Sequence, residues 1–173
     1  MATKTQMDVE EYLHTSFDGA DCEYLEGEIV ERNMGQTLHG MIQAWMTYLL
    51  LQRAGAAGIR VITEIRIRIT NQRYRIPDIA VWRAGDDLGI GIPKCSPFLA
   101  IEILSPDDRP VAIMAKVHDY FSSGIEWIWI VDPYEGTAMV YSDASPTGEQ
   151  VDMLRTESPA IAIPLEEVLN PRP

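Results

Sequence analysis

The chain has 173 residues, of which 46% are hydrophobic and 23% charged, and its formal net charge is −12. This length and composition fit one domain over residues 1–173 and exclude a disordered chain. No apolar stretch approaches the ~20 residues of a membrane span, and the first residues contain no apolar segment of a secretory signal. Two cysteines, Cys22 and Cys95, fit no metal or redox motif. We therefore expect a cytoplasmic protein with reduced thiols and no membrane partner.

Local patterns predict a helix, a hairpin and a longer helix in the first third of the chain. Asp8–His14 is predicted to form a short amphipathic helix, and Tyr24–Val30 a tight hairpin. Thr37–Arg53 has apolar residues at a period of 3.6 and predicts the longest helix. Gly55 and Gly58 are expected to end it.

The apolar period then changes to two, which predicts strands. Val61–Thr70 alternates along its length, Asn71-Gln72 turns the chain, and Tyr74–Trp82 returns as a second strand. Phe98–Leu104 is almost wholly apolar, as expected of a strand that is covered on both faces.

A strand–helix–strand unit is predicted over Phe98–Val131. Ser105-Pro106-Asp107-Asp108 contains a capping serine, a proline suited to the first helical position and an acid three residues after the cap. The helix is expected to run to Ser123, and Trp127–Val131 to form a strand parallel to the first with a right-handed crossover. The remaining elements are predicted as a hairpin and a short helix: Ala138–Tyr141 with Gln150–Arg155, and Leu165–Leu169.

Positive charge is concentrated in one segment of this acidic chain. Between Arg53 and Arg83 there are seven arginines against Glu64 and Asp78, a local charge of +5 within 31 residues. The net charge of the whole chain repels nucleic acid and membrane surfaces, so a polyanion would have to meet this segment.

Glu102 is the charged residue of the predicted central strand, and its neighbours on both faces are apolar. An unpaired buried carboxylate costs several kcal/mol, or its pKa shifts until the group is neutral. One interpretation is a structural pair with an arginine or a helix N-terminus. The other is a catalytic or metal-binding role, which is typical of carboxylates in apolar surroundings.

Asp78 and Lys116 are the next candidates. Asp78 follows Pro77 and shares a predicted strand face with apolar residues, although it also fits a plain turn aspartate. Two carboxylates held close together repel, so a pair of Asp78 and Glu102 favours a divalent cation or a shared proton. Lys116 lies mid-helix among apolar residues, where snorkelling or a pair with Asp119 is the simpler explanation. Its helix leaves the C-terminal end of the Glu102 strand, so the inner helix face is expected to look back over that strand.

Two further residues are possible additions to this group. His39 starts the long helix, where a purely structural histidine is equally expected, and Glu28 lies in a hairpin, where exposed glutamates are common. The sequence contains no phosphate-binding loop, His-Glu-x-x-His, Gly-x-Ser-x-Gly or paired Cys-x-x-Cys motif.

Four segments together resemble the restriction-endonuclease family that is common in bacterial genomes, a branch of the PD-(D/E)XK nuclease-like superfamily. These segments are Pro77-Asp78, Glu102-Ile103-Leu104-Ser105-Pro106, Lys116 and Gly124–Pro133. The resemblance covers Met7–Val168. It implies an α/β fold of the restriction-endonuclease-like type, with a mixed central β-sheet flanked by helices.

The resemblance also implies roles for individual residues. Asp78 and Glu102 would bind the metal, with the backbone carbonyl of Ile103 as a further ligand. The superfamily's usual lysine, two residues after the glutamate, is replaced here by Leu104, and Lys116 would take its place. The acid that the family often has shortly before this lysine is missing.

The implied activity is metal-dependent hydrolysis of phosphodiester bonds in nucleic acid, with DNA as the expected substrate and Mg²⁺ or Mn²⁺ as the cofactor. The predicted nucleic-acid contacts are Arg66, Arg68, Arg73 and Arg75. Duplex cleavage needs two cuts, so a two-fold homodimer is expected. The alternative is a catalytically inactive homodimer of nuclease fold that acts as an interaction or binding protein, which the net charge and the missing acid favour. A metal-binding hydrolase that is not a nuclease has no specific feature in its support.

Overall fold

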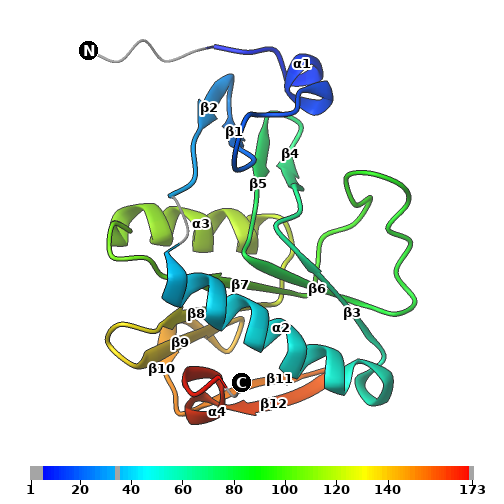
Figure 1. Ribbon diagram of the computed structural model, residues 1–173. Coiled ribbons are helices and arrows are strands. Elements are labelled where there is room, and N and C mark those ends of the chain that lie inside the picture. The colour runs from blue at the N-terminus through cyan, green and yellow to red at the C-terminus, as the bar shows by residue number, and fades with distance from the viewer. Residues whose placement is uncertain (1–5, 34–35, 172–173) are drawn as a thin grey trace.

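The structure is a computed structural model that describes residues 6–33 and 36–171 (Figure 1). In chain order its elements are α1 (Val9–His14), β1 (Glu23–Leu25), β2 (Glu28–Val30), α2 (Thr37–Ala57), β3 (Ile59–Thr63), β4 (Ile67–Thr70), β5 (Arg73–Arg75), β6 (Ile79–Arg83), β7 (Leu99–Ile103), α3 (Pro110–Ser122), β8 (Trp127–Asp132), β9 (Thr137–Ser142), β10 (Ser145–Gln150), β11 (Met153–Glu157), β12 (Ala160–Pro164) and α4 (Leu165–Leu169). In the described ranges, no helix is long and apolar enough to cross a membrane.

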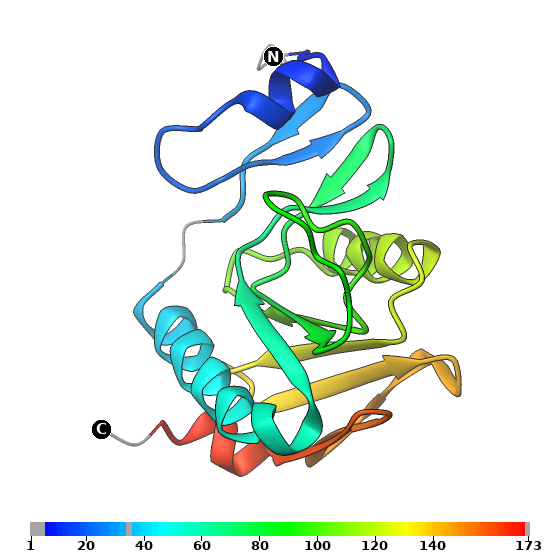
Figure 2. The same cartoon turned by 90° about the vertical axis from the view of Figure 1, so that its right-hand side faces the viewer.

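A six-stranded sheet with the order β10-β9-β8-β7-β6-β3 forms the centre of the fold. Its neighbouring strands are antiparallel except for β7 and β8, which are parallel and are connected through α3. The predicted strand–helix–strand unit and the mixed central sheet are therefore confirmed. Figures 1 and 2 show α2 and α3 on opposite sides of this sheet.

Alternation along the central strands sends side chains into two separate cores. Ile79 and Leu99 pack on the α2 side, whereas Ala80 and Ala100 pack on the α3 side. Both faces of β7 are covered, which is why all five of its residues are buried and why the segment is so apolar.

A smaller sheet with the order β2-β1-β5-β4 lies beside α1 at the top of Figure 1. Its core is a cluster of three buried tyrosines, Tyr12, Tyr24 and Tyr74. Asp8 caps α1 by accepting a hydrogen bond from the Glu10 N–H at 2.9 Å. The predicted first helix and first hairpin are thus confirmed within one or two residues.

The two long strands predicted over Val61–Thr70 and Tyr74–Trp82 are each interrupted, which corrects the prediction. The first breaks at Glu64, whose φ of 51° lies in the left-handed region. The second breaks before β6 at Pro77, which has no N–H to donate to a sheet. The outer halves, β4 and β5, join the small sheet, while β3 and β6 belong to the central one. This split leaves Asp78 at the junction of the two sheets.

The helix predicted to start at Ser105 starts instead at Pro110, so that prediction was wrong at its N-terminus. The expected contact between Ser105 and Asp108 does form, with the Ser105 N–H donating to Asp108 Oδ2 at 2.7 Å, but it closes a turn. A proline disfavours helical backbone in the preceding residue, and Arg109 is accordingly extended (φ −96°, ψ 131°). Residues 105–109 therefore form a loop at the end of β7.

Two other boundaries differ from the prediction. Gly55 lies inside α2, and Gly58 alone ends that helix with a φ of 63°. The segment 150–155 does not form one strand against β9. Instead β9 pairs with β10, and β11 pairs with β12, because the chain turns tightly at residues 143–144 and again at 158–159. The predicted final helix is observed over Leu165–Leu169.

Candidate functional site

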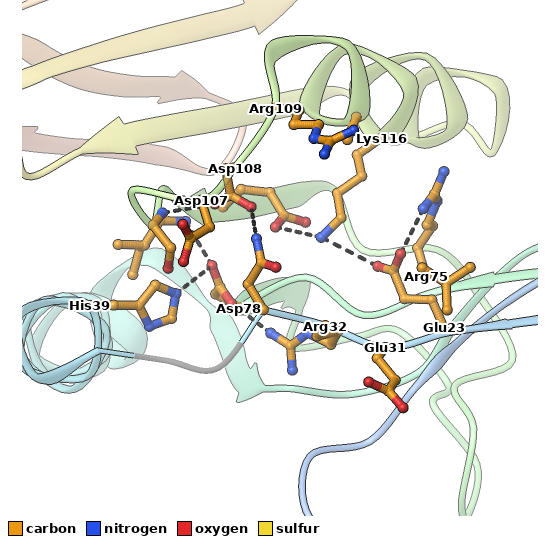
Figure 3. Close-up of a pocket in the computed structure, with 16 residues that line it drawn as sticks. Glu23, Glu31, Arg32, His39, Arg75, Asp78, Asp107, Asp108, Arg109 and Lys116 are labelled. Carbon is orange, nitrogen blue, oxygen red and sulfur yellow. Dashed lines mark hydrogen bonds and ion pairs between the residues drawn. The ribbon is translucent and has the colours of Figure 1, made fainter. Parts of the chain in front are cut away.

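A solvent-open cavity of about 240 Å³ lies where the two sheets meet (Figure 3). Its walls come from β1, the end of β2 and the segment after it, the start of α2, the end of β5, the residues before β6, the end of β7, the 105–109 loop and α3. The cavity is thus assembled from segments that are far apart in the sequence, and the breaks at Glu64 and Pro77 create the junction that it occupies.

Asp78 lies on one side of this cavity and is only 3% exposed. Arg32 Nη2 donates to its Oδ1 at 2.6 Å, and the backbone N–H of Ile103 donates to its Oδ2 at 2.7 Å. His39 Nε2 lies 3.2 Å from the same Oδ2. Burial alone acts to raise the pKa of Asp78, but the His39 contact and the Ile103 N–H outweigh it and hold the pKa below its usual range. Asp78 is therefore an anion fixed in one orientation.

Glu102 faces the cavity from β7 and is 4% exposed. Lys116 Nζ donates to its Oε2 at 2.9 Å, and the Tyr120 hydroxyl donates to its Oε1. Burial, aided by the negative charges of Asp78 and Glu23, raises the pKa of Glu102 to about 7, although Lys116 opposes the rise. Near neutral pH, the protonated and the ionised forms of the Glu102 carboxyl are therefore both populated.

Lys116 reaches the cavity from α3 and lies between two carboxylates. Its Nζ is 3.3 Å from Glu23 Oε1, in addition to its contact with Glu102. Burial acts to lower the pKa of Lys116, but these two carboxylates outweigh it and raise the pKa above its usual range. Lys116 is therefore a positioned ammonium group and not a free amine.

Glu23 is held rigidly beneath this lysine. Arg75 Nη1 donates to Glu23 Oε2 at 2.6 Å, and the Ile76 N–H donates to Glu23 Oε1 at 3.1 Å. Arg75 in turn pairs with Asp119 at 2.7 Å, and both side chains are almost fully buried. The network fixes the position of the Lys116 ammonium from the side opposite to Glu102.

Six of the site residues predicted from the sequence line this one cavity: His39, Arg75, Asp78, Glu102, Ile103 and Lys116. Glu28 does not line it and lies on β2, where it forms an isolated bridge with Gln6. The expected partner of Lys116, Asp119, pairs with Arg73 and Arg75 instead.

Sequence reasoning missed three residues that shape the site. Glu23 opens β1 as a charge beside apolar residues, a signal similar to that of Glu102 but in a strand only three residues long. Tyr120 stands four residues after Lys116, on the same helix face, and its hydroxyl marked it as more than a packing residue. Arg32 has no such signal, because it lies in an irregular segment between β2 and α2.

Comparison with known proteins identifies the family. A family model described as "Putative restriction endonuclease", named Uma2, matches residues 9–170. The chain belongs to the Uma2 family. Membership supports a nuclease-like function, and the name of the family points to endonuclease activity. No curated protein matches the Uma2 chain.

Solved structures agree with the fold. A crystal structure described as a putative nuclease belonging to DUF820 from Anabaena variabilis ATCC 29413 is 23% identical, with a TM-score of 0.81 over 94% of the Uma2 chain and 97% of the other. At this identity the likeness establishes the nuclease-type fold alone. A structure of a DrdV–DNA complex is 17% identical with a TM-score of 0.42, covering 63% of the Uma2 chain and 10% of the other, which is too low to support an argument.

The donor atoms in the Uma2 cavity fit a divalent cation. Asp78 and Glu102 offer carboxylate oxygens, the ligands that Mg²⁺ and Mn²⁺ prefer. Six acidic and four basic side chains line the cavity, so negative charge is in excess. Residues 6–33 and 36–171 contain no ready-made group of three His, Cys, Asp or Glu ligands. Backbone oxygen, water or a phosphate would therefore complete the coordination, as is common for Mg²⁺, and restriction-endonuclease-like proteins generally use divalent metal ions.

Three of the four arginines predicted to bind nucleic acid have internal partners in the Uma2 fold. Arg66 pairs with Asp21 at 2.6 Å, Arg73 pairs with Glu26 at 2.7 Å, and Arg75 lies in the buried network described above. Arg68 on β4 is exposed and makes no ion pair with any described residue. We therefore retain only Arg68 as a candidate phosphate contact.

Proposed function

We propose that this Uma2 protein is a divalent-metal-dependent endonuclease that hydrolyses phosphodiester bonds of DNA. The observation that carries the proposal is the convergence of Asp78, Glu102 and Lys116 in one open cavity. Asp78 and Glu102 would hold the cation, with the Ile103 carbonyl as a further ligand. When bound, the metal would neutralise charge on the phosphate and lower the pKa of an attacking water.

Each protein group has a separate task in this proposal. Lys116 is an ammonium between two carboxylates, so it would stabilise negative charge that develops on the phosphate, and it is not the base. His39 fixes the orientation of Asp78 through Oδ2, and Tyr120 does the same for Glu102 through Oε1. His39 and Tyr120 are therefore positioning residues.

A second candidate is a nuclease-fold protein that binds partners without cutting nucleic acid. The observation in its favour is that protein groups already contact every oxygen of Asp78 and Glu102. The two candidates differ in whether an added cation changes these contacts. The homodimer expected for either candidate stays a prediction, which light scattering of the purified protein would test. The identity of the metal as Mg²⁺ and the cytoplasmic location also stay predictions.

Cleavage assays on supercoiled plasmid, linear duplex, single-stranded DNA and RNA, each with Mg²⁺, Mn²⁺ or EDTA, test the first candidate. Wild type should cut DNA only with metal. Glu102→Gln and Lys116→Met should each lower the rate by roughly 10²-fold or more, because each removes a charge that acts in the transition state. Equal cleavage by wild type and Glu102→Gln in every metal would mark the activity as contamination and favour the second candidate.

A further inference from the structure

Arg32 pairs with Asp78, one of the two proposed metal ligands. Its Nη2 lies 2.6 Å from Asp78 Oδ1, and its Nη1 lies 3.8 Å from Glu64 Oε2. The Arg32 side chain is only 12% exposed, so the pair with Asp78 is largely shielded from water. Figure 3 shows the guanidinium reaching Asp78 from the segment after β2.

The contacts of the Asp78 carboxylate other than the Arg32 pair are all made by Oδ2. Oδ2 already accepts from the Ile103 N–H at 2.7 Å and lies 3.2 Å from His39 Nε2. Ile103 belongs to β7, the fully buried central strand, so its N–H cannot withdraw without disturbing the sheet. Arg32 lies outside every helix and strand, so its side chain can leave at lower cost. Oδ1 is therefore the oxygen through which Asp78 can accept a new ligand.

The charge of Arg32 also opposes the binding of a cation at this place. Burial acts to lower the pKa of Arg32, but the charges of Asp78 and Glu102, with smaller contributions from other acids, raise it, so the guanidinium stays charged. A positive charge near both proposed metal ligands repels a divalent cation as well as blocking Oδ1.

We propose that Arg32 is a built-in competitor of the divalent cation, which holds Asp78 in the metal-free protein and leaves Oδ1 when the cation binds. The inference rests on the metal site of the proposed function. The Arg32–Asp78 pair would then weaken metal binding, because only the molecules in which Arg32 is displaced can bind the cation. The apparent Kd is the intrinsic Kd divided by the fraction of such molecules.

Titration of the full chain with Mn²⁺ in a calorimeter, without nucleic acid, tests the proposal. Arg32→Gln should bind Mn²⁺ at least about tenfold more tightly than wild type, since the competing population is removed. Arg109→Gln is the matched control. Arg109 lines the same cavity and is exposed, makes no ion pair with any described residue, and in Figure 3 lies on the α3 side. The Arg109→Gln substitution removes the same charge without changing a contact of Asp78. It should change the Kd for Mn²⁺ by less than about threefold, because the Arg109 charge is screened by solvent.

Equal or weaker Mn²⁺ binding by Arg32→Gln would overturn the proposal, and so would an equal gain in Arg109→Gln. A wild type that binds no Mn²⁺ supports the proposal if Arg32→Gln binds it, and refutes it together with the metal site if neither does. Should Arg32→Gln not fold, the ¹⁵N resonance of the Arg32 Nε in wild type, assigned with Arg32→Lys, replaces it. That resonance should move when Mg²⁺ saturates the protein, and an unmoved resonance overturns the proposal.

The cleavage assay separates the two conclusions. Tighter metal binding by Arg32→Gln, in a protein that cuts no nucleic acid, would support the competitor role and refute the endonuclease. Metal-dependent cleavage, together with equal Mn²⁺ affinities of wild type and Arg32→Gln, would support the endonuclease and refute the competitor role.

Discussion

Glu102→Gln should change how the stability of the fold depends on pH. Glu102 is almost fully buried on β7, and burial together with the charges of Asp78 and Glu23 raises its pKa from 4.5 to about 7. Ionising this carboxyl therefore opposes folding. Glutamine keeps the shape of the side chain and cannot ionise, so the variant does not lose this stability when the pH rises.

The size of the effect follows from the shift in pKa. One pKa unit corresponds to about 1.4 kcal/mol, so a pKa of about 7 against 4.5 corresponds to roughly 3 kcal/mol. The folded protein binds the proton more tightly than the unfolded chain does. The contribution of Glu102 to stability is thus fully present below pH 4.5 and is lost as the pH rises through about 7. As the pH rises from 4.5 to about 7, the free energy of unfolding of Glu102→Gln should therefore increase by roughly 3 kcal/mol relative to that of wild type.

Urea unfolding of both proteins in EDTA, at pH values from about 4.5 to 8, measures this difference. His39, whose pKa is raised mainly by its hydrogen bond to Asp78, is present in both proteins, so its contribution to the pH dependence cancels in the difference. Glu149→Gln is the control, because Glu149 is an exposed glutamate on β10, outside the cavity. A difference between Glu102→Gln and wild type that stays constant with pH, or that shrinks as the pH rises, would refute the reasoning.

Two other predictions concern the metal and the surface. Mg²⁺ or Mn²⁺ at ten times its Kd should stabilise wild type by about 1.4 kcal/mol, and Asp78→Ala should abolish this increment in a thermal-shift titration; an unchanged increment would place the metal elsewhere. Arg68→Ala should weaken DNA binding and flatten its salt dependence with little change in Tm, because Arg68 is exposed and makes no ion pair with any described residue. Arg66→Ala, by contrast, should lower Tm, since it loses the ion pair with Asp21 and the contact of its guanidinium with the Tyr12 ring at 4.2 Å. Equal effects of the two substitutions on Tm and on binding would contradict this division.

The parts of the fold that could be predicted from the sequence are those set by local patterns. The unit over Phe98–Val131 is confirmed because a run of apolar residues, a helical period and a second apolar run each specify their own element. The start of α3 was predicted wrongly because two local signals compete. Ser105 and Asp108 form the contact of a helix start, but Pro110 holds the residue before it in an extended conformation.

The interruptions at Glu64 and Pro77 show a different limit. The alternation of apolar and polar residues continues across Glu64, and the second segment stays largely apolar on both sides of Pro77, so these patterns alone give one strand where the structure has two. Which half joins which sheet depends on packing against α1 and the tyrosine cluster, and periodicity carries no information on that choice.

Candidate site residues were visible when their charge contrasted with apolar neighbours. Asp78, Glu102 and Lys116 all have such surroundings, and they line one cavity. Arg32 stands in a polar stretch, and its partner Asp78 is 46 positions away in the sequence. Nothing local distinguishes it from a solvated arginine, so only the folded chain brings it to the site.

The position of Lys116 follows from the way the chain crosses over between β7 and β8. The superfamily's usual lysine would stand at Leu104, two residues after Glu102, where side-chain alternation keeps it on the same face of the sheet. Here Leu104 packs into the apolar cluster on the α3 side. Because the parallel pairing of β7 and β8 requires a crossover, α3 covers that face, and a lysine on its inner side comes within 2.9 Å of Glu102. Tyr120, one helical turn further on, contacts the same carboxylate and fixes the register of the helix over the strand. The ammonium group can thus reach the carboxylate from either segment, and the fold requires only that the helix lie over the strand that bears the glutamate.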